Sequence, residues 1–318
     1  MNIIGTGHAV PNMVLTNDML KELVDTSDEW ITTRTGIHTR FVSTDEELVD
    51  LAIKASRNAL ENSGLAPEDI DFVFCSNVAS NYVTPSMSTM VAGALKLSCP
   101  CIDINGACAG FVYALDLAEA YFRTHDVRNM LILCAEAVTQ FVDWKQRETC
   151  VLFGDGAGAV VATKGNNLLA TTVKTVPMKD VIIYRRRLEP TPFEKEGTNI
   201  NSPMVLKGRE VFRMAVNSSQ ADLHAVMDKA GVTPQQVDHF MLHQANQRIV
   251  DAIQEHLQLP KSKFPSNIGN HGNTSSASIP ILLDEENRAG HLKDGDILAF
   301  SAFGAGFVSG AALLRWGN

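Results

Sequence analysis

Apolar and polar residues alternate along the chain with two different periods, and each period predicts a type of element. Between positions 47 and 63, apolar residues recur at the spacing of one helical face: Leu48, Leu51, Ala52, Ala55 and Leu60. Gly64 follows this stretch and is a candidate C-cap. The next segment, 70–75, is mostly apolar, and a run of this length predicts a buried strand.

The same alternation continues along the chain. Helices are predicted over 85–97 and 108–121, and strands over 102–104 and 130–135. An apolar, glycine-rich strand pair is predicted over 149–162. This order of elements indicates an α/β fold in which helices cover a central sheet.

The segment 60–75 recurs at 227–242. Helix end, glycine, proline, aspartate and strand are related by one offset, because 231 − 64, 234 − 67 and 238 − 71 all equal 167. A single offset through a whole helix–turn–strand unit indicates an internal duplication. We therefore predict a first half over 1–163, a divergent connecting or cap segment over 164–207, and a second half over 208–318. Functional residues are expected from both halves, where the halves meet.

Composition limits the class of protein. Of the 318 residues, 45% are hydrophobic and 20% are charged, as in a globular protein with a sizeable core. A net charge of −9 disfavours nucleic-acid binding, because that binding depends on cationic contacts to phosphate. No apolar run approaches the roughly 18 residues that cross a bilayer, so no membrane span is expected. Residues 1–7 predict a strand entering a glycine turn and not a signal peptide.

Six cysteines lie in apolar surroundings, at positions 75, 99, 101, 108, 134 and 150. In a chain of this length they predict reduced thiols and a cytoplasmic protein. Cys99 and Cys101 are too close for the usual structural zinc spacing, and no second Cys or His pair completes a site, so no metal is expected. Five of the six are interpreted as small buried hydrophobes.

The sixth cysteine, Cys108, is a candidate nucleophile in the string Asp103-Ile-Asn-Gly-Ala-Cys108-Ala-Gly-Phe. A strand ends there, small residues turn, and a helix begins at or near the thiol. The positive end of a helix dipole and unpaired N–H groups favour a thiolate. The small neighbours allow close approach of a substrate. Taken alone, a buried structural cysteine is an equally good interpretation.

Two histidines compete as partners of this thiol. His243 opens the string His243-Gln-Ala-Asn246 directly after the repeated strand, which is where ligand crevices form in α/β sheets. His271 lies in the segment 270–278, which is rich in turn-forming residues and is typical of an ordinary loop. Each of them also fits a satisfied surface or core histidine, so the pattern leaves the choice open.

Two glycine-rich strings, 153–158 and 303–307, raise the question of a nucleotide site. Neither has the order G-x-G-x-x-G followed by a long helix, and neither is a P-loop, so the support for such a site is weak. Backbone N–H groups in strings of this kind can instead form an oxyanion hole.

Taken together, these motifs resemble the β-ketoacyl-acyl carrier protein synthase III family, condensing enzymes of the thiolase superfamily. The resemblance covers nearly the whole chain and rests on 26–37, the Cys108 string, 152–158, 243–246, 271–275 and 302–307. The spacing agrees, with 243 − 108 = 135 and 273 − 243 = 30. The resemblance implies a five-layered α-β-α-β-α fold of two similar halves, a homodimer, and no metal or organic cofactor.

The resemblance also implies a mechanism. Cys108 would attack an acyl-CoA and become acylated, while the N–H groups of Cys108 and Ala305 bind the oxyanion. A malonyl thioester would then enter, and His243 and Asn273 would hydrogen-bond its carbonyl so that loss of CO₂ leaves a stabilised enolate. Phe303 would give the malonyl carboxylate an apolar surrounding. Attack of the carbanion on the acyl group would yield a β-ketoacyl thioester, in fatty-acid initiation or a related pathway.

By the same resemblance, five residues bind the acyl-CoA donor. Trp30 matches a residue that stacks on the nucleotide, and Arg34 and Arg147 match residues that hold phosphate. Phe212 and Asn246 match the walls of the pantetheine tunnel. A packed aromatic and solvated surface charges are the alternative interpretations of the first three.

The chain departs from the family pattern at the acyl pocket. Thr84 stands where the family usually has an aromatic residue that reaches across the dimer and closes the partner's pocket. A smaller, polar residue there predicts a pocket that admits a longer, polar or aromatic starter. The connecting segment carries Arg185-Arg186-Arg187, interpreted as a solvated loop face. A minority hypothesis makes this triplet a docking site for an acidic carrier or a carboxylated acyl group.

The expected partner is an acyl carrier protein, although its docking face also departs from the pattern. Glu255 and His256 stand where a basic pair is expected on the carrier-facing helix. Arg213 and Arg248 remain as candidate contacts to an acidic carrier. The choice between a malonyl carrier protein and malonyl-CoA stays open.

Two other function classes stay open as well. One is a specialised-metabolism acyltransferase or condensing enzyme that loads an unusual acyl group, a reading that Thr84 and the divergent segment favour. The other is a non-catalytic thiolase-like subunit, which the intact set of Cys108, His243 and Asn273 disfavours. No sequence feature supports a nucleic-acid role.

Overall fold

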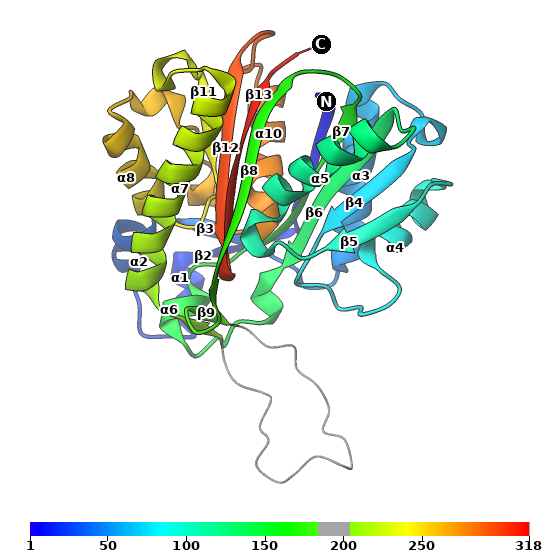
Figure 1. Ribbon diagram of the computed structural model, residues 1–318. Coiled ribbons are helices and arrows are strands. Elements are labelled where there is room, and N and C mark those ends of the chain that lie inside the picture. The colour runs from blue at the N-terminus through cyan, green and yellow to red at the C-terminus, as the bar shows by residue number, and fades with distance from the viewer. Residues whose placement is uncertain (184–203, 318) are drawn as a thin grey trace.

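The computed structural model describes residues 1–183 and 204–317, and it contains two main β-sheets with helices on their faces (Figure 1). The first sheet has the strand order β1-β7-β6-β4-β5. Its strands are β1 (Asn2–Ala9), β4 (Phe72–Ser76), β5 (Cys101–Ile104), β6 (Asn129–Ala137) and β7 (Asp155–Thr163). β4 pairs in parallel with β5 and β6, while β7 pairs antiparallel with β6 and β1. β4 is buried along its whole length, as expected of a strand covered on both faces.

The second sheet has the order β11-β12-β13-β8. Its strands are β8 (Leu168–Met178), β11 (His239–Leu242), β12 (Ile297–Gly304) and β13 (Gly306–Arg315). β11 and β12 are parallel, and the other two pairings are antiparallel. The predicted boundary between the halves is therefore wrong at one end. Strand β8 was assigned to the connecting segment 164–207, yet it belongs to the second sheet because it pairs with β13.

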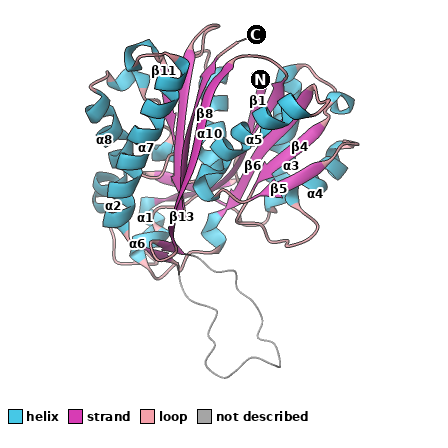
Figure 2. Ribbon diagram, in the orientation of Figure 1, coloured by secondary structure: helices cyan, strands magenta, loops and turns pink. Residues whose placement is uncertain are grey.

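Helices form three layers around the two sheets (Figure 2). α3 (Leu48–Ser63) and α4 (Met87–Leu95) cover the outer face of the first sheet, and α7 (Gly208–Ala230) and α8 (Gln247–Leu257) cover the outer side of the second. α5 (Gly110–Thr124) and α10 (Ser278–Arg288) lie in the middle and contact strands of both sheets. The order is helix, sheet, helix, sheet, helix, which confirms the predicted five-layered fold.

The internal repeat is visible in the elements themselves. α3 and α7 both end at a glycine in the left-handed region, Gly64 with φ 72° and Gly231 with φ 66°. A short 3₁₀ turn follows in each copy, η1 (Pro67–Asp69) and η4 (Pro234–Gln236), and then β4 or β11. The central helices continue the correspondence at an offset of 278 − 110 = 168. The two halves thus share one order of elements.

Several predicted boundaries shift. The strand pair over 149–162 is a short helix, α6 (Arg147–Cys150), followed by the single strand β7. The helix predicted from residue 85 is α4, which begins at Met87. The N-terminal strand does not stop at its glycines, since β1 runs to Ala9. Gly5 and Gly7 lie there because a Cβ on either would come within 2.4 Å of the backbone of α3.

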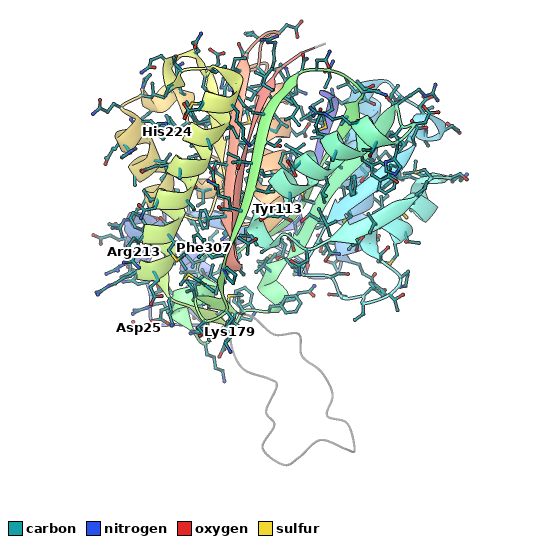
Figure 3. All side chains as sticks on the ribbon, in the orientation of Figure 1. Asp25, Tyr113, Lys179, Arg213, His224 and Phe307 are labelled. Carbon is teal, nitrogen blue, oxygen red and sulfur yellow. The ribbon has the colours of Figure 1, made fainter. Side chains whose placement is uncertain are left out.

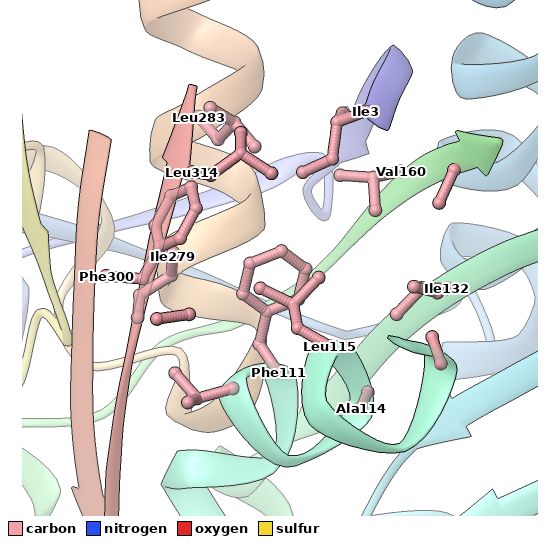
Figure 4. Packing of buried hydrophobic residues seen from close by; sticks show 14 of the residues in the cluster. Ile3, Phe111, Ala114, Leu115, Ile132, Val160, Ile279, Leu283, Phe300 and Leu314 are labelled. Atoms are coloured by element: carbon pink, nitrogen blue, oxygen red, sulfur yellow. The ribbon is translucent and has the colours of Figure 1, made fainter. Parts of the chain in front are cut away.

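Apolar side chains fill the space between the sheets (Figure 4). Phe111 and Leu115 on α5 meet Ile279 and Leu283 on α10, and Phe300 of β12 packs edge-to-face on Phe111. The two central helices are buried on almost every side near this contact, so they hold the two sheets at a fixed separation. The turns that precede both helices are positioned by this packing.

The smaller elements gather at one end of the molecule (Figure 1). They are β2 (Met13–Thr16), β3 (Thr39–Val42), β9 (Ile182–Ile183), β10 (Val205–Leu206), α1 (Asn17–Leu20), α2 (Asp28–Thr35), α9 (Ile268–His271) and η3 (Val138–Gln140). The turn η5 (Lys261–Lys263) lies instead beside η4, where Lys263 Nζ donates to the carbonyl of Gln235. Leu20, Ile31 and Ile37 form part of an apolar cluster that supports several of them. Within the described residues, no helix has the length and apolar character needed to cross a membrane.

Candidate active site

A cavity of about 740 Å³ lies where the two halves meet. Eleven of the predicted site residues line it: Trp30, Arg34, Cys108, Arg147, Phe212, His243, Asn246, Arg248, Asn273, Phe303 and Ala305. They come from both halves, and their numbers span 275 positions (305 − 30). The structure therefore brings together what the sequence keeps far apart. The chemical roles of these residues remain predictions at this point.

Cys108 lies in the middle of a 3₁₀ turn, η2 (Ala107–Ala109), immediately before α5. The turn is tight, and Ala107 has φ 46°, in the left-handed region. Gly304 at the end of β12 passes directly against it, so that a Cβ at residue 304 would lie 2.6 Å from the backbone N of Cys108. Glycine is required at 304 because only a bare backbone fits there.

The expected thiolate at Cys108 is not the resting state. The thiol is half-buried in the cavity, and burial raises its pKa to about 12, an effect that a hydrogen bond from Ser275 only partly offsets. The helix start favours the anion, but the loss of solvent around the thiol disfavours it more strongly. Deprotonation of Cys108 thus needs a proton acceptor or a bound substrate.

Ser275 is a cavity residue that sequence reasoning did not single out. Its hydroxyl donates to Cys108 Sγ at 3.3 Å. The residue lies in η6 (Ser275–Ala277), just before α10, and has φ 53°. A signal was present, since Ser275 belongs to the string that carries Asn273, and 275 − 108 equals the repeat offset of 167.

His243 is buried at the end of β11. Burial lowers the pKa of its ring to about 3, so the imidazole is neutral at physiological pH. Its Nδ1 lies 2.7 Å from Ser278 Oγ, which also accepts the N–H of Gln244. With Ser278 donating its own proton to Nδ1, the ring proton is held on Nε2, and the neutral ring is a hydrogen-bond donor. The ring meets Phe303 at 5.3 Å between centroids.

Asn273 is fixed by the loop that precedes β7. Its backbone N–H donates to Leu152, and its carbonyl accepts from Gly154. Its side-chain Oδ1 accepts the N–H of Ser275, which leaves the Nδ2 amide as the group that can donate into the cavity. Asn273 and His243 therefore present two neutral donors to one cavity.

His271 is not a second candidate at this cavity. It does not line the cavity, and its Nε2 lies 2.7 Å from Glu285 of α10. The glycine strings are explained by packing, because a Cβ at Gly154 would lie 2.1 Å from the carbonyl oxygen of His271. Asp155 in the same string accepts three hydrogen bonds from Ser43 and Thr139 and is buried.

The mouth of the cavity carries a cluster of arginines around Trp30. The guanidinium carbons of Arg34 and Arg147 lie 4.8 and 4.5 Å from the centroid of the indole ring. Cation–π contacts of this kind hold both charges at the entrance. Arg147 also donates to the carbonyl of Asp25. The cluster has the flat aromatic surface and the positive charge that a nucleotide with phosphates would need.

The opposite side of the mouth comes from α7 and α8. Phe212 is partly exposed, and Arg248 lies 5.9 Å over its ring. Asn246 caps α8, accepting the N–H of Arg248, and its amide donates to the carbonyl of Arg34. Arg209 also lines the cavity and was missed by the sequence analysis, because an exposed arginine in the first turn of a helix carries no motif.

Two predicted contacts, Arg213 and Thr84, lie outside the cavity lining. Arg213 is exposed on α7, outside the cavity lining, and projects from the molecule (Figure 3). Thr84 is exposed on the loop before α4 and does not line the cavity of its own chain. The triplet Arg185-Arg186-Arg187 lies outside the described residues. Glu255 and His256 are exposed on α8.

All six cysteines are free thiols. Cys75, Cys134 and Cys150 are buried, whereas the side chains of Cys99 and Cys101 are only half-buried. Across the described ranges, no group of three or more His, Cys, Asp or Glu side chains is placed to hold a metal ion.

Comparison with known proteins agrees with this arrangement. The family model described as 3-oxoacyl-[acyl-carrier-protein] synthase III matches residues 102–177, and the model of the C-terminal part of the same family matches residues 227–316. A β-ketoacyl-[acyl-carrier-protein] synthase III of Aquifex aeolicus is 41% identical over 315 residues, covering 99% of both chains.

Solved structures give the same result. The synthase III of Thermus thermophilus is 36% identical, with a TM-score of 0.93 over 100% of this chain and 99% of that one. The priming β-ketosynthase of the R1128 polyketide pathway is 28% identical, with a TM-score of 0.92 over 100% of this chain and 96% of that one. The thiolase-like fold is therefore shown by identity and by structure together.

Proposed function

The chain belongs to the 3-oxoacyl-[acyl-carrier-protein] synthase III family, and from this premise we propose that it joins an acyl-CoA starter to malonyl-acyl carrier protein. The product is a β-ketoacyl thioester on the carrier, as in the initiation of fatty-acid synthesis. The observation that carries the proposal is the meeting of one thiol, Cys108, with two neutral donors, His243 and Asn273, in a single cavity. A transferase that only moved acyl groups would not need two neutral donors beside its nucleophile.

In the first step the sulfur of Cys108 attacks the thioester carbonyl of the acyl-CoA. The oxyanion forms beside the backbone N–H groups of Cys108 and Ala305, which the close approach of Gly304 holds on one side of the cavity. The C–S bond to CoA breaks, and the acyl group stays on Cys108. The tight turn and the bare backbone at Gly304 support this arrangement.

In the second step a malonyl thioester replaces CoA. His243 and Asn273 donate to its thioester carbonyl, so the electrons released with CO₂ are stabilised as an enolate. A charged imidazolium is not needed, because the pKa of His243, lowered to about 3 by burial, keeps the ring neutral. The apolar ring of Phe303 beside His243 disfavours the malonyl carboxylate and favours its loss.

The nucleotide end of CoA fits the arginine-rich mouth. Arg34, Arg147, Arg209 and Arg248 line it, and Trp30 offers an aromatic face. The phosphates of CoA are complementary to these charges. An acidic carrier protein would present its phosphopantetheine at the same entrance, with exposed Arg213 and Arg248 as its contacts on α7 and α8.

We propose that the working protein is a homodimer formed through the first sheet. β5 is the last strand of that sheet, so one of its edges has no strand partner among the residues that the structure describes. Ile102 on β5 is 49% exposed and Val83 is 75% exposed, both apolar. A second copy would cover them and bring its Thr84 to this cavity. Light scattering of the purified chain should give about twice the 34.6 kDa chain mass.

The function is tested by intact-protein mass spectrometry after incubation with acyl-CoA donors from acetyl to medium-chain, dicarboxylic and aromatic. We expect an adduct on the native chain and none on Cys108→Ala. Cys99→Ala is the matched control, since this thiol is half-buried but does not line the cavity, and it should load normally. Loading of Cys108→Ala, or no loading of the native chain by any donor, would contradict the proposal.

The same panel separates a second candidate function. Thr84 is a small polar residue at the position proposed to close the partner's pocket, and this favours a larger or polar starter in a specialised pathway. A clean adduct from acetyl alone supports fatty-acid initiation, whereas preference for a larger donor supports the specialised pathway. The free thiols fit a reducing cytoplasm, which stays a prediction from the sequence.

A further inference from the structure

A buried carboxylate lies behind the proposed nucleophile. Glu136 is in strand β6, is fully buried, and does not line the cavity. Its Oε1 lies 3.4 Å from Ser275 Oγ, and the same hydroxyl lies 3.3 Å from Cys108 Sγ. One serine hydroxyl therefore connects the thiol to a carboxylate that is shielded from solvent.

Glu136 has many hydrogen-bond donors but no cation. Ser276 donates to Oε1 at 2.6 Å, and the N–H groups of Val78 and Ala79 donate to Oε2 at 3.1 and 3.2 Å. Among the described residues, no Lys, Arg or His forms an ion pair with it. Burial without a counter-charge raises the pKa of Glu136 to about 7, although the four donors oppose the shift.

The titratable groups around Glu136 are thiols. Cys108 faces it from η2, Cys134 shares its strand, and Cys75 interacts with it from β4, and burial raises the pKa of each. Asp155 lies opposite Ala137 on the neighbouring β7 and is occupied by Thr139 and Ser43. Glu136 is thus the group near Cys108 that can gain or lose a proton near neutral pH.

We propose that Glu136 accepts the proton of the Cys108 thiol through the hydroxyl of Ser275. The Ser275 hydroxyl first turns its proton from Cys108 Sγ to Glu136 Oε1. The S–H bond of Cys108 then breaks as its proton passes to Ser275 Oγ, and the original hydroxyl proton passes to Glu136 Oε1. The negative charge moves from the carboxylate to the sulfur, and no net charge enters the buried site. After condensation the sulfur leaves the adduct as a thiolate and regains its proton by the reverse path.

His243 is a poorer acceptor for this proton. Its pKa of about 3 means that protonating the ring costs far more than protonating Glu136. This division leaves His243 neutral and available as a donor to the malonyl carbonyl. Glu136 acts on the nucleophile only through Ser275, so it is a positioning residue in the loading step. The inference rests on the proposed function for its role in acyl transfer.

The test follows the rate of Cys108 alkylation by iodoacetamide from pH 5 to 10, with peptide mapping to separate Cys108 from the other thiols. In the native chain the rate should rise with a midpoint near pH 7, where Glu136 ionises, and then form a plateau. The plateau should end at higher pH, where direct loss of the thiol proton takes over, because the pKa of Cys108 itself is about 12. In Glu136→Gln the plateau should disappear, and the rate at pH 7.5 should fall at least tenfold. Glu136→Asp, which keeps the acid, should restore the plateau.

A matched serine pair separates the proton path from general support of the fold. Ser275→Ala should remove the plateau, because it breaks the link to Cys108. Ser276→Ala should keep the plateau and move its midpoint to higher pH, because it removes a donor to the ionised carboxylate but does not touch Cys108. If Glu136→Gln does not fold, the pH profile of alkylation in Ser275→Ala tests the proton path by itself.

The outcomes distinguish this inference from the proposed function. A native-like pH profile in either Glu136→Gln or Ser275→Ala would overturn the proton path, while acyl loading of Cys108 would still support the condensing activity. The alkylation plateau can be measured without any acyl donor. If no donor acylates Cys108, the proposed function is contradicted. The proton path is still tested independently by the pH profile of alkylation.

Discussion

Two turns meet at the floor of the cavity, one from each half of the chain. η2 leads into α5, η6 leads into α10, and their offset is 275 − 107 = 168. Each turn begins at a residue with positive φ, Ala107 at 46° and Ser275 at 53°. The backbones are alike, but one turn carries a thiol and the other carries two hydroxyls.

The difference shows how a duplicated fold becomes an asymmetric site. Because each turn is fixed at the end of a central helix, the duplication places the two turns face to face. Only the first half needs a nucleophile, so the second half supplies groups that act on it: Ser275 on the sulfur, and Ser276 on the carboxylate of Glu136. The second half also contributes His243 and Asn273. The first half thus supplies the proposed nucleophile, and the second half supplies groups proposed to assist it.

The largest effect is expected from breaking the contact between the halves at Gly304. In Gly304→Ala the new Cβ would lie 2.6 Å from the N of Cys108 and 2.8 Å from the Cβ of Ala107, so the η2 turn has to move. We expect acyl loading, measured by mass spectrometry, to fall about 10³-fold or more, from a misplaced nucleophile and a lost oxyanion donor.

The control for this variant is Gly93→Ala in α4. A Cβ there meets nothing within 4 Å, so loading should stay native. Removing a helical glycine should also raise the free energy of unfolding by about 0.5–1 kcal/mol. Native loading in Gly304→Ala would mean that the halves do not need this close approach.

The next largest effect is expected from removing one hydrogen-bond donor of the second half, the side-chain amide of Asn273. Asn273→Ala should lower the rate of malonyl decarboxylation about 10²–10³-fold, the usual cost of one donor to a developing oxyanion. Acyl loading of Cys108 should change little, because the proposed loading step uses the thiol and the N–H groups of Cys108 and Ala305, and not the Asn273 amide. Asn270→Ala, at an exposed position in α9, should leave both steps unchanged. Equal losses in both steps of Asn273→Ala would refute the assignment of Asn273 to the decarboxylation step alone.

A smaller effect is expected at the mouth, where both turns stay intact. Arg147→Ala should raise KM for acyl-CoA about 10- to 100-fold, because a contact between an arginine and phosphate is worth about 1.5–3 kcal/mol. For a short acyl thioester without the nucleotide, KM should stay native. Arg128→Ala removes a surface arginine remote from the cavity lining and serves as the control. A similar rise of KM for acyl-CoA and for the short thioester would contradict this prediction, because it would mean that the substitution disturbs the floor of the cavity and not the binding of the nucleotide.

The smallest effect is expected from pH, which should not change the rate of decarboxylation between pH 5 and 8. Burial lowers the pKa of His243 to about 3, so the ring should lose no proton and gain none between pH 5 and 8. Decarboxylation by Cys108→Ala, which isolates this step from the thiol, should therefore be independent of pH over that range. A fall in rate below pH 6.5 would show that His243 does become charged.

Much of the fold followed from local pattern. The helix over 48–63, its glycine cap and the strand after it were predicted by spacing, and the repeat offset predicted two similar halves. β8 was missed because half of its positions are polar or exposed, so its apolar pattern is weak. What makes it a strand is pairing with β13, for example Ala311 with Thr172, a contact across 139 residues (311 − 172) that no local window contains.

The candidate site was predicted in part for the same reason. Cys108 and His243 follow strand ends and Asn273 stands in a string of turn formers, but the resemblance to a known family was needed to select these three residues. Glu136 stands in an apolar strand with no motif around it. Its importance comes from a serine that is distant in sequence and close in space.

The sequence by itself predicted most of the elements, their repetition and the strings in which the candidate site residues stand, because periodicity, glycine positions and motif spacing are local properties. Only the tertiary structure decided how those side chains ionise and which of them touch. A pKa depends on the solvent removed and the neighbours gained when distant segments pack, so the neutral thiol of Cys108, the neutral ring of His243 and the path to Glu136 exist only in the folded chain.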